Sequence, residues 1–179
     1  MQEQEKLERF ELTVLPHFRE AYGLARWLTR NEQDAEDVVQ EAYLRAFRFF
    51  DGVRGIDCRP WLFTIVRNTY YTWRKRSRHD VNVIALDEHV EERADAVSDP
   101  DVKLLQSVDT DRLRRCIDLL PAEDREVLLL REFEDLSYKE IATVTGLPLG
   151  TVMSRLSRAR GRLQACVIAC SKEGSNDLQ

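Results

Sequence analysis

The chain is poor in the residues that interrupt helices and in the long apolar runs that cross membranes. Of its 179 residues only 7 are glycine and 5 are proline. No apolar run approaches the roughly 18 residues that a membrane-spanning helix needs, and alternating β-branched runs are few. These shortages argue against a sheet-rich fold and against membrane insertion. Together with 43% hydrophobic and 33% charged residues, they predict an all-α globular protein.

Cysteine and histidine are also scarce, which argues against a metal centre or an enzyme. The 4 cysteines contain no C-x-x-C pair; Cys58 and Cys116 are isolated, and Cys166 and Cys170 lie one helical turn apart. Residues 1–9 are charged and show no secretory signal, so we expect a cytoplasmic protein whose cysteines are all thiols that pack as small apolar side chains. The 3 histidines are scattered and no nucleophile–base pair accompanies them. We expect no metal, no cofactor and no catalytic residue; direct sensing through the C-terminal cysteine pair is the minor alternative.

The formal net charge is −5, but the charges are segregated along the chain. Basic residues cluster in residues 67–78 and 151–163, whereas acidic residues fill the N-terminal third and the middle. Segregation of this kind predicts that DNA binds the basic faces and that a different partner, a protein, binds elsewhere.

An acidic segment divides the chain into two small helical domains. Residues 80–101 carry many acids against a single arginine and have no sustained helical stripe. A structureless loop of this length is unusual inside one compact domain, so we expect a flexible linker. The domains then span residues 1–79 and 102–170, and residues 171–179 form a tail.

The strongest local pattern lies in residues 136–163 and predicts two short helices joined by a tight turn. Ser137 and Glu140 form a capping box that begins the first helix, and Gly146 supplies its end. Pro148 begins the second helix, whose apolar stripe is Val152, Leu156, Ala159 and Leu163. No acidic residue lies in the second helix, so its basic face is unopposed. The pattern predicts a helix-turn-helix with a recognition helix for the major groove; the alternative is a helical hairpin with solvated arginines.

The N-terminal domain begins with two amphipathic helices and a third that has an acidic face. Apolar residues recur at three- and four-residue steps, with a break at Pro16 and an end near Thr29: Leu7, Phe10, Val14, Phe18, Ala21, Ala25 and Leu28. Asn31 and the acids after it begin the third helix. Its apolar side is Val39, Ala42, Tyr43, Ala46, Phe47 and Phe50, and its other side is Asp37, Gln40, Glu41, Leu44, Arg45 and Arg48. A leucine among acids and amides is either incidental or part of a protein-docking surface.

A further helix, opened by Pro60, interleaves aromatic and basic side chains. Its expected buried stripe is Leu62, Ile65, Val66, Thr69 and Trp73. Its other side presents Trp61, Thr64, Asn68, Tyr71, Thr72 and Lys75, with Arg59 before it and Arg74, Arg76 and Arg78 after. Rings stack on unpaired bases, amides read base edges and cations bind phosphates, so the helix is a candidate for single-stranded DNA. The alternative is that the rings are partly buried and the cations are surface charges.

Three segments together resemble the small extracytoplasmic-function sigma factors of bacterial RNA polymerase. Residues 34–48 (DAEDVVQEAYLRAFR) resemble the core-polymerase-binding helix, and residues 59–76 (RPWLFTIVRNTYYTWRKR) the helix that melts and reads the −10 element. Residues 120–163 resemble the fourth-region domain that reads the −35 element. The resemblance implies an alternative sigma factor that binds core RNA polymerase at the β′ clamp and the β flap. It also implies promoter DNA and an anti-sigma factor as partners.

The resemblance assigns roles to sets of residues. It implies contact with the β′ clamp for Asp34, Asp37, Gln40, Glu41 and Leu44. It implies contact with the −10 strand for Arg59, Trp61, Asn68 and Tyr71, and with nearby phosphates for Arg74, Lys75 and Arg76. In the recognition helix it implies base contacts for Ser154 and Arg158 and phosphate contacts for Thr151, Arg155 and Arg162.

Two departures from the family pattern lie near the recognition helix. Met153 stands where the family usually has lysine or arginine, and Leu149 replaces an acid often found beside the turn. The −35 sequence that this chain prefers therefore does not follow from the resemblance. The competing interpretation of the whole chain is a two-domain helix-turn-helix repressor or activator whose first domain senses a ligand. Co-purification with core polymerase separates the two.

Overall fold

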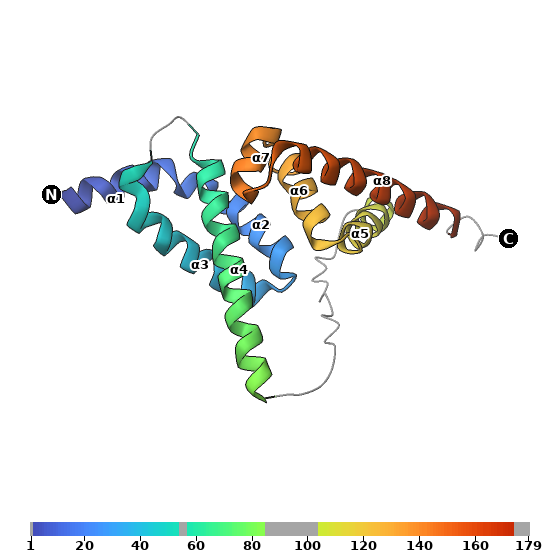
Figure 1. Ribbon diagram of the computed structural model, residues 1–179, viewed down its shortest axis with the longest axis horizontal. Helices are drawn as coiled ribbons and strands as arrows, with labels where there is room; N and C mark the ends of the chain where they lie inside the picture. Colours follow the sequence, from blue (N-terminus) through green and yellow to red (C-terminus); the bar gives the residue numbers. More distant parts are fainter. Residues whose placement is uncertain (1, 54–56, 85–103, 174–179) are drawn as a thin grey trace. The chain divides into compact units, whose positions relative to one another are not determined.

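The computed structural model describes residues 2–53, 57–84 and 104–173, and every regular element within these ranges is helical (Figure 1). In chain order the α-helices are α1 (Gln2–Thr13), α2 (Phe18–Thr29), α3 (Glu32–Phe49), α4 (Arg59–Ile84), α5 (Leu104–Asp118), α6 (Ala122–Glu132), α7 (Tyr138–Thr145) and α8 (Leu149–Glu173). Short 3₁₀ helices at Leu15–His17 and Phe50–Gly52 follow α1 and α3. The all-α prediction is confirmed. Two compact units divide the chain, the first containing α1–α4 and the second α5, α6 and α8.

Helix α4 extends further than the sequence pattern indicates. It runs to Ile84, so residues 80–84 continue the helix, whereas the pattern placed the start of the linker there. The rest of the expected linker, residues 85–101, lies outside the described residues. No helix within the described ranges is both long and apolar enough to cross a membrane.

The core of the N-terminal unit lies where α2, α3 and α4 pack on one another. Leu24 of α2, Val38 of α3 and Leu62 and Phe63 of α4 are almost fully buried. The Asn31 side chain caps α3 by accepting the Asp34 N–H at 3.1 Å, as the sequence predicts. Burying these side chains supplies the main stabilisation, at about 1.5–3 kcal/mol for each large apolar side chain.

An aromatic cluster attaches α1 to the end of α3. The Phe10 ring meets the rings of Tyr43, Phe47 and Phe50 edge-on, with centroids 6.2, 5.3 and 5.3 Å away. Lys6 adds an ion pair with Asp51 at 2.6 Å. The first amphipathic helix is therefore held beside α3 by packed rings.

The C-terminal unit is built around the contact between α6 and α8. Leu120, Leu128 and Ala159 form a buried cluster, and the half-buried Leu163 packs against it. Val152 and Leu156 of α8 are also buried, so the stripe that the sequence predicts for the recognition helix is confirmed. Helix α8 continues to Glu173, well beyond this stripe.

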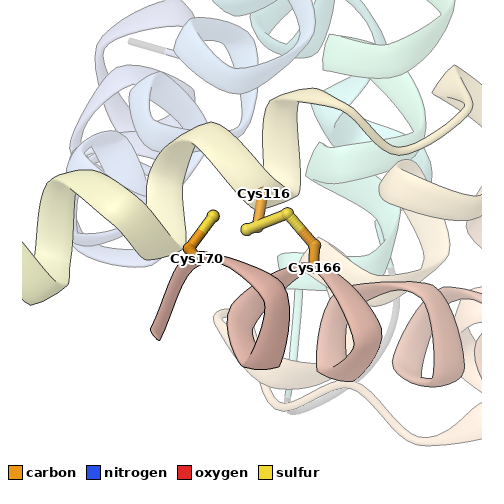
Figure 2. Close-up of side chains that lie close together, drawn as sticks. All are labelled: Cys116, Cys166 and Cys170. Atoms are coloured by element: carbon orange, nitrogen blue, oxygen red, sulfur yellow. A yellow bond between two sulfur atoms is a disulfide. The ribbon is translucent and has the colours of Figure 1, made fainter. Parts of the chain in front are cut away.

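One expectation about the cysteines is wrong. Cys116 of α5 and Cys166 of α8 form a disulfide, with their Cα atoms 5.7 Å apart and a separation of 50 positions in the sequence (Figure 2). No sequence pattern links the two positions, because only the packing of α5 on α8 brings them together. In the chain-entropy account, closing a loop of this length stabilises the folded unit by about 4 kcal/mol. Cys58 and Cys170 are free thiols, and Cys58 packs in the core of the first unit as expected.

The turn between α7 and α8 has the geometry that the sequence predicts. The Ser137 hydroxyl accepts the Glu140 N–H at 3.3 Å and the Glu140 carboxylate accepts the Ser137 N–H at 2.7 Å, which is a complete capping box. Gly146 ends α7 at a φ of 70°, and the Pro148 carbonyl accepts the N–H groups of the first turn of α8.

We predict opposite effects from two glycine substitutions. A Cβ added at Gly146 meets no atom within 4 Å, so Gly146→Ala carries only the cost of a left-handed backbone, about 1–2 kcal/mol of destabilisation. Gly161 lies inside α8 with equally open space, so Gly161→Ala stabilises by up to about 1 kcal/mol through helix propensity. Urea unfolding followed by circular dichroism measures both. Equal effects from the two substitutions would contradict the left-handed turn.

Candidate functional site

The polar face of α3 presents the residues that the resemblance assigns to polymerase. Asp37 and Gln40 are exposed, and Leu44 is 58% exposed. Asp34 and Glu41 are half-buried at the edges of the same face. The positions recur at three- and four-residue steps, so the five side chains form one row along the helix. An apolar side chain this exposed, within a row of acids, is available to a protein partner.

The charges along this row are not equivalent. Burial and the neighbouring charge of Asp37 both raise the pKa of Asp34 above its ordinary value. Glu41 forms an ion pair with Arg45 one turn along α3 and lies 3.9 Å from the guanidinium of Arg76 on α4. Glu41, which the resemblance assigns to polymerase, therefore lies within ion-pair distance of Arg76, which it assigns to promoter DNA.

An apolar groove of about 820 Å³ opens beside this row, between α1, α2 and α3. Leu7 and Phe18, expected to be buried, are 45% and 49% exposed and line this groove instead. Leu44 and Gln40 line it too, so the groove and the acidic row share residues. The stripe pattern is correct in its period but cannot distinguish a core contact from an open groove.

At the start of α4, Arg59 is held by Asp57. Arg59 donates to the two carboxylate oxygens through Nε at 3.1 Å and through Nη2 at 2.8 Å, and its backbone N–H donates to Asp57 Oδ1 at 2.9 Å. These hydrogen bonds hold the pKa of Asp57 below its ordinary value. The guanidinium is thereby fixed at the helix entrance, where the resemblance places a −10 contact.

The aromatic side of α4 is partly buried and partly open. Arg67 lies over the Tyr71 ring at 4.7 Å, and the Tyr70 ring meets the Tyr71 ring at 5.1 Å. Asn68, Lys75 and Arg76 are exposed, whereas Trp61, Tyr71 and Arg74 are half-buried. The rings are partly buried, as the alternative interpretation expects, and they still present area to solvent, so the contact with single-stranded DNA stays a prediction.

The expected buried stripe of α4 needs correction. Leu62, Val66 and Thr69 are buried as expected, but Ile65 and Trp73 are only half-buried. Phe63 and Tyr70 are buried although the pattern did not assign them to the core. Helix α4 packs against both α2 and α3, so it buries a wider arc than a single stripe.

The recognition helix α8 presents the predicted arc. Ser154 is exposed and its hydroxyl donates to the Thr151 carbonyl at 3.0 Å, and Thr151 is half-buried. Arg158 and Arg162 are exposed one turn apart, whereas Met153, 48% exposed, lies about 140° around the helix from Arg158. Thr151, Ser154, Arg158 and Arg162 have the spacing of a single exposed surface.

The basic face of α8 is opposed by acids, which the sequence of that helix does not show. Asp124 of α6 is 4% exposed and its two oxygens accept from Arg158 at 3.3 Å and from Arg162 at 3.1 Å. Arg155 pairs with Glu123 at 2.7 Å. The expectation of an unopposed basic face is therefore wrong, because two first-turn acids of α6 lie beside it.

This arrangement orients the arginines without using all of their donors. A guanidinium has five N–H groups in a fixed fork, and Asp124 receives one from each of Arg158 and Arg162. A neighbouring arginine, Arg160, donates instead to Glu132 through Nε at 3.0 Å and Nη2 at 2.6 Å, which raises its pKa. Helix α8 thus carries two kinds of arginine: Arg158 and Arg162 are held by Asp124, and Arg160 is bound to Glu132.

Comparison with known proteins places both units in one family. Residues 13–79 match the family model for sigma-70 region 2, and residues 110–163 match the one for sigma-70 region 4. The RNA polymerase sigma-H factor of Pseudomonas aeruginosa is 37% identical over 158 residues, which cover 84% of this chain and 82% of the relative. The ECF RNA polymerase sigma factor EcfG of Rhodopseudomonas palustris is 31% identical over 175 residues, covering 93% and 86%.

Solved structures give the same result. The sigma factor RpoE of Bartonella quintana, in complex with the anti-sigma factor NepR, has a TM-score of 0.68 and 30% identity over 89% of this chain and 97% of that one. CnrH, in complex with the cytosolic domain of CnrY, has a TM-score of 0.61 and 26% identity over 87% of this chain and 85% of that one. The chain belongs to the extracytoplasmic-function (ECF) sigma factors of bacterial RNA polymerase.

Proposed function

We propose that this chain binds core RNA polymerase through α3 and directs it to promoters, reading the −10 element with α4 and the −35 element with α8. The observation that carries the proposal is the presence, in one chain, of an acidic row with an exposed leucine, a basic aromatic helix beside it and a separate helix-turn-helix. A helix-turn-helix repressor needs only the last of these. A repressor function would therefore leave the acidic row of α3 and the basic aromatic side of α4 unexplained.

The −35 contact follows from the geometry of α8. Ser154 and Arg158 lie on the exposed arc, where they reach base edges, and a bidentate arginine–guanine contact is worth about 1–3 kcal/mol of discrimination. Arg162 and Thr151 flank them as phosphate contacts. Arg155 is the most buried of the three arginines, with a side chain 17% exposed against 55% for Arg158 and 53% for Arg162. It is held by Glu123, so it contributes mainly to the local electrostatic potential.

The −10 contact follows from the open part of α4. Asn68, Lys75 and Arg76 are exposed, and Tyr71 presents a ring braced by Arg67. A base that leaves the duplex gains about 1–3 kcal/mol by stacking on an aromatic side chain. Arg59, Trp61 and Arg74 complete the surface at the entrance and along its edge. This gain is similar to the few kcal/mol needed to unstack a base, so it helps to hold a melted strand.

The polymerase contact uses the acidic row, and the anti-sigma contact uses the groove beside it. Asp34, Asp37, Gln40, Glu41 and Leu44 offer charge and one apolar side chain to the β′ clamp. The apolar groove lined by Leu7, Phe18 and Leu44 offers area to an amphipathic helix. Because Leu44 belongs to both surfaces, an anti-sigma factor in the groove would compete with polymerase. We place this regulation in the cytoplasm, with the β flap holding the C-terminal unit.

The first prediction concerns polymerase binding. Asp37→Arg combined with Leu44→Asp removes the exposed charge and the exposed apolar side chain of the row, and should lower holoenzyme formation at least about tenfold. Glu8→Arg reverses an exposed charge on α1 and should bind normally. Gel filtration with core polymerase measures both. If circular dichroism shows that the double variant is folded and it still forms normal amounts of holoenzyme, α3 is not the docking surface.

A second prediction concerns the recognition helix. Arg158→Ala should weaken holoenzyme binding to a −35 promoter about 10- to 100-fold, because it removes a groove-facing donor. Arg160→Ala removes the same charge from the same helix but from the arginine bound to Glu132, and should change binding by less than about threefold. Band-shift titrations of holoenzyme with promoter DNA compare the two. Equal losses would mean that net charge, not position, determines binding.

The third prediction concerns Asp124, which touches no DNA in the proposal. Asp124→Asn keeps the size of the side chain but releases two guanidinium groups from a buried carboxylate. Affinity for non-promoter DNA should rise, and the slope of log K against log salt concentration should become steeper by about one unit. The preference for promoter over non-promoter DNA should fall. Binding at several salt concentrations, on promoter and non-promoter DNA, gives both quantities. An unchanged slope with unchanged preference would show that Asp124 only supports the fold.

A further inference from the structure

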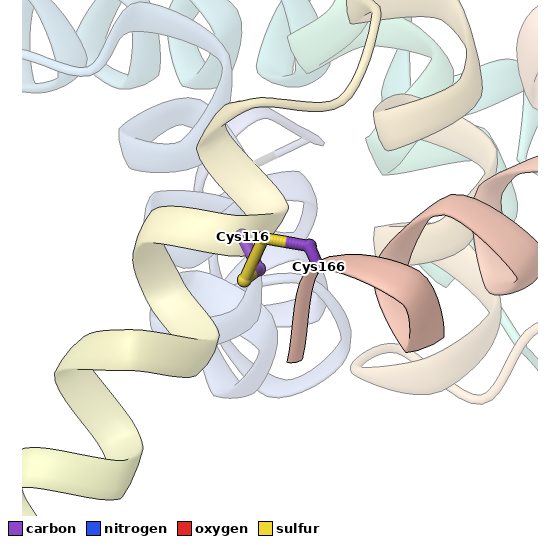
Figure 3. The surroundings of a disulfide bond; sticks show 2 residues. All are labelled: Cys116 and Cys166. Atoms are coloured by element: carbon purple, nitrogen blue, oxygen red, sulfur yellow. A yellow bond between two sulfur atoms is a disulfide. The ribbon is translucent and has the colours of Figure 1, made fainter. Parts of the chain in front are cut away.

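Three cysteines that are distant in the sequence meet between α5 and α8. Cys116 comes from α5, and Cys166 and Cys170 come from successive turns of α8 (Figure 2). Their sulfur atoms all lie within 4.8 Å of one another. Figure 3 shows that the bond between Cys116 and Cys166 bridges the two helices. The sequence shows only the pair on α8, so the third member is a product of the fold.

The donor set consists of sulfur alone. Among the described histidine, cysteine and carboxylate side chains, these three cysteines are the group whose ligand atoms lie close enough to hold a metal ion. Cys116 is buried, and Cys166 and Cys170 are half-buried, so an ion here would be partly shielded yet reachable from solvent. Thiolate sulfur selects soft cations such as Zn²⁺ and Cu⁺ over hard ones such as Mg²⁺.

The spacing of the sulfurs suits such an ion. Zinc–thiolate bonds are about 2.3 Å long, which places the sulfurs of a tetrahedral site about 3.8 Å apart and those of a trigonal site about 4.0 Å apart. The observed limit of 4.8 Å leaves a shift of about 1 Å, which rotation of the cysteine side chains supplies. The disulfide sulfurs, by contrast, must separate for an ion to enter. The site is therefore an alternative to the disulfide, not an addition to it.

We propose that Cys116, Cys166 and Cys170, once the disulfide is reduced, bind a thiophilic d¹⁰ cation, Zn²⁺ or Cu⁺, which ties α5 to α8. Two molecules of a cellular monothiol reduce the disulfide: the sulfur–sulfur bond breaks, two protein thiols form, and the monothiols join as their own disulfide. The cation then replaces the three thiol protons and forms three metal–sulfur bonds. Solvent completes a tetrahedral zinc shell, whereas Cu⁺ needs no fourth ligand.

The physical reason for such a site is the position of the bridge. The loop that it closes contains α6, α7 and most of α8, which is the whole helix-turn-helix. A reducing compartment removes a disulfide, but a metal ion on the same sulfurs preserves the cross-link there. The reverse exchange uses the disulfide of the same monothiol as oxidant: it accepts two electrons and becomes two monothiols, the ion leaves, and the Cys116–Cys166 bond forms again. The inference rests on the proposed function only in naming this unit the −35 reader.

The test uses the full-length chain reduced with a phosphine in the absence of oxygen. Zn²⁺ and Cu⁺ are titrated separately against chromophoric competing chelators, and bound metal is counted by mass spectrometry after gel filtration. The expected result is about one ion per wild-type chain. Cys170→Ser should weaken binding at least about 100-fold, the upper end of the loss seen when an outer-shell partner is removed.

Two controls make the outcome specific. Cys170→Ser keeps both bridging cysteines, so after oxidation it should still form the Cys116–Cys166 disulfide, which alkylation and intact mass detect; this shows that the variant is folded at α5 and α8. Cys58→Ser removes the free cysteine of the other unit and should leave metal binding unchanged.

Each outcome decides the proposal. The proposal is supported if the wild type binds about one ion, Cys58→Ser binds the same amount, and Cys170→Ser loses binding. The ion that the protein retains against the stronger chelator identifies the metal. Failure of the reduced wild type to bind either ion, or equal binding by Cys170→Ser and wild type, overturns the proposal. Metal binding is measured without polymerase or promoter, so its failure is distinguishable from failure of the proposed function.

Discussion

The structure depends on one constraint: a short amphipathic helix can bury one face, and the face left over remains for a partner. Helix α3 shows this directly, because Val38 and Val39 are buried while Asp37 and Leu44 on the other side are exposed. Helix α8 repeats the arrangement, with Leu156 in the core and Arg158 outside. In a chain this rich in helix, the same periodicity that builds the core also defines the binding surfaces.

The carboxylate of Asp124 shows how a binding surface is tied to the core. A charge this buried is unfavourable unless it is paired, and two guanidinium groups satisfy it from side chains that are themselves about half exposed. The partly exposed ion pairs contribute little stability on their own. Their value lies in orientation, because the same pairs that satisfy Asp124 fix where Arg158 and Arg162 point. Specific readout benefits from arginines that are already ordered before DNA arrives.

The sequence predicted best those features whose cause is local. The capping box at Ser137, the cap at Asn31 and the left-handed Gly146 each involve residues three or four positions apart, and all are present. Contacts between helices were missed, because Asp124 and Arg158 are 34 residues apart and their helices meet only in the fold. The disulfide was missed for the same reason. Leu7 and Phe18 fit a buried stripe in period, but each is about half exposed where it lines the groove. The roles of the site residues remain proposals.

The contact between Glu41 and Arg76 bears on how the surfaces work together. Arg76 is 67% exposed on its side chain and at 3.9 Å its interaction with Glu41 is weak, so a phosphate or a polymerase cation could replace either partner at small cost. Polymerase that engages Glu41 would leave Arg76 more available to DNA, and DNA that engages Arg76 would leave Glu41 more available to polymerase. Because such coupling is reciprocal, each surface would, under the proposed function, favour the other's partner. A chain with net charge −5 attracts DNA weakly by itself, so in that proposal tethering to polymerase is what would make its small DNA-reading surfaces sufficient.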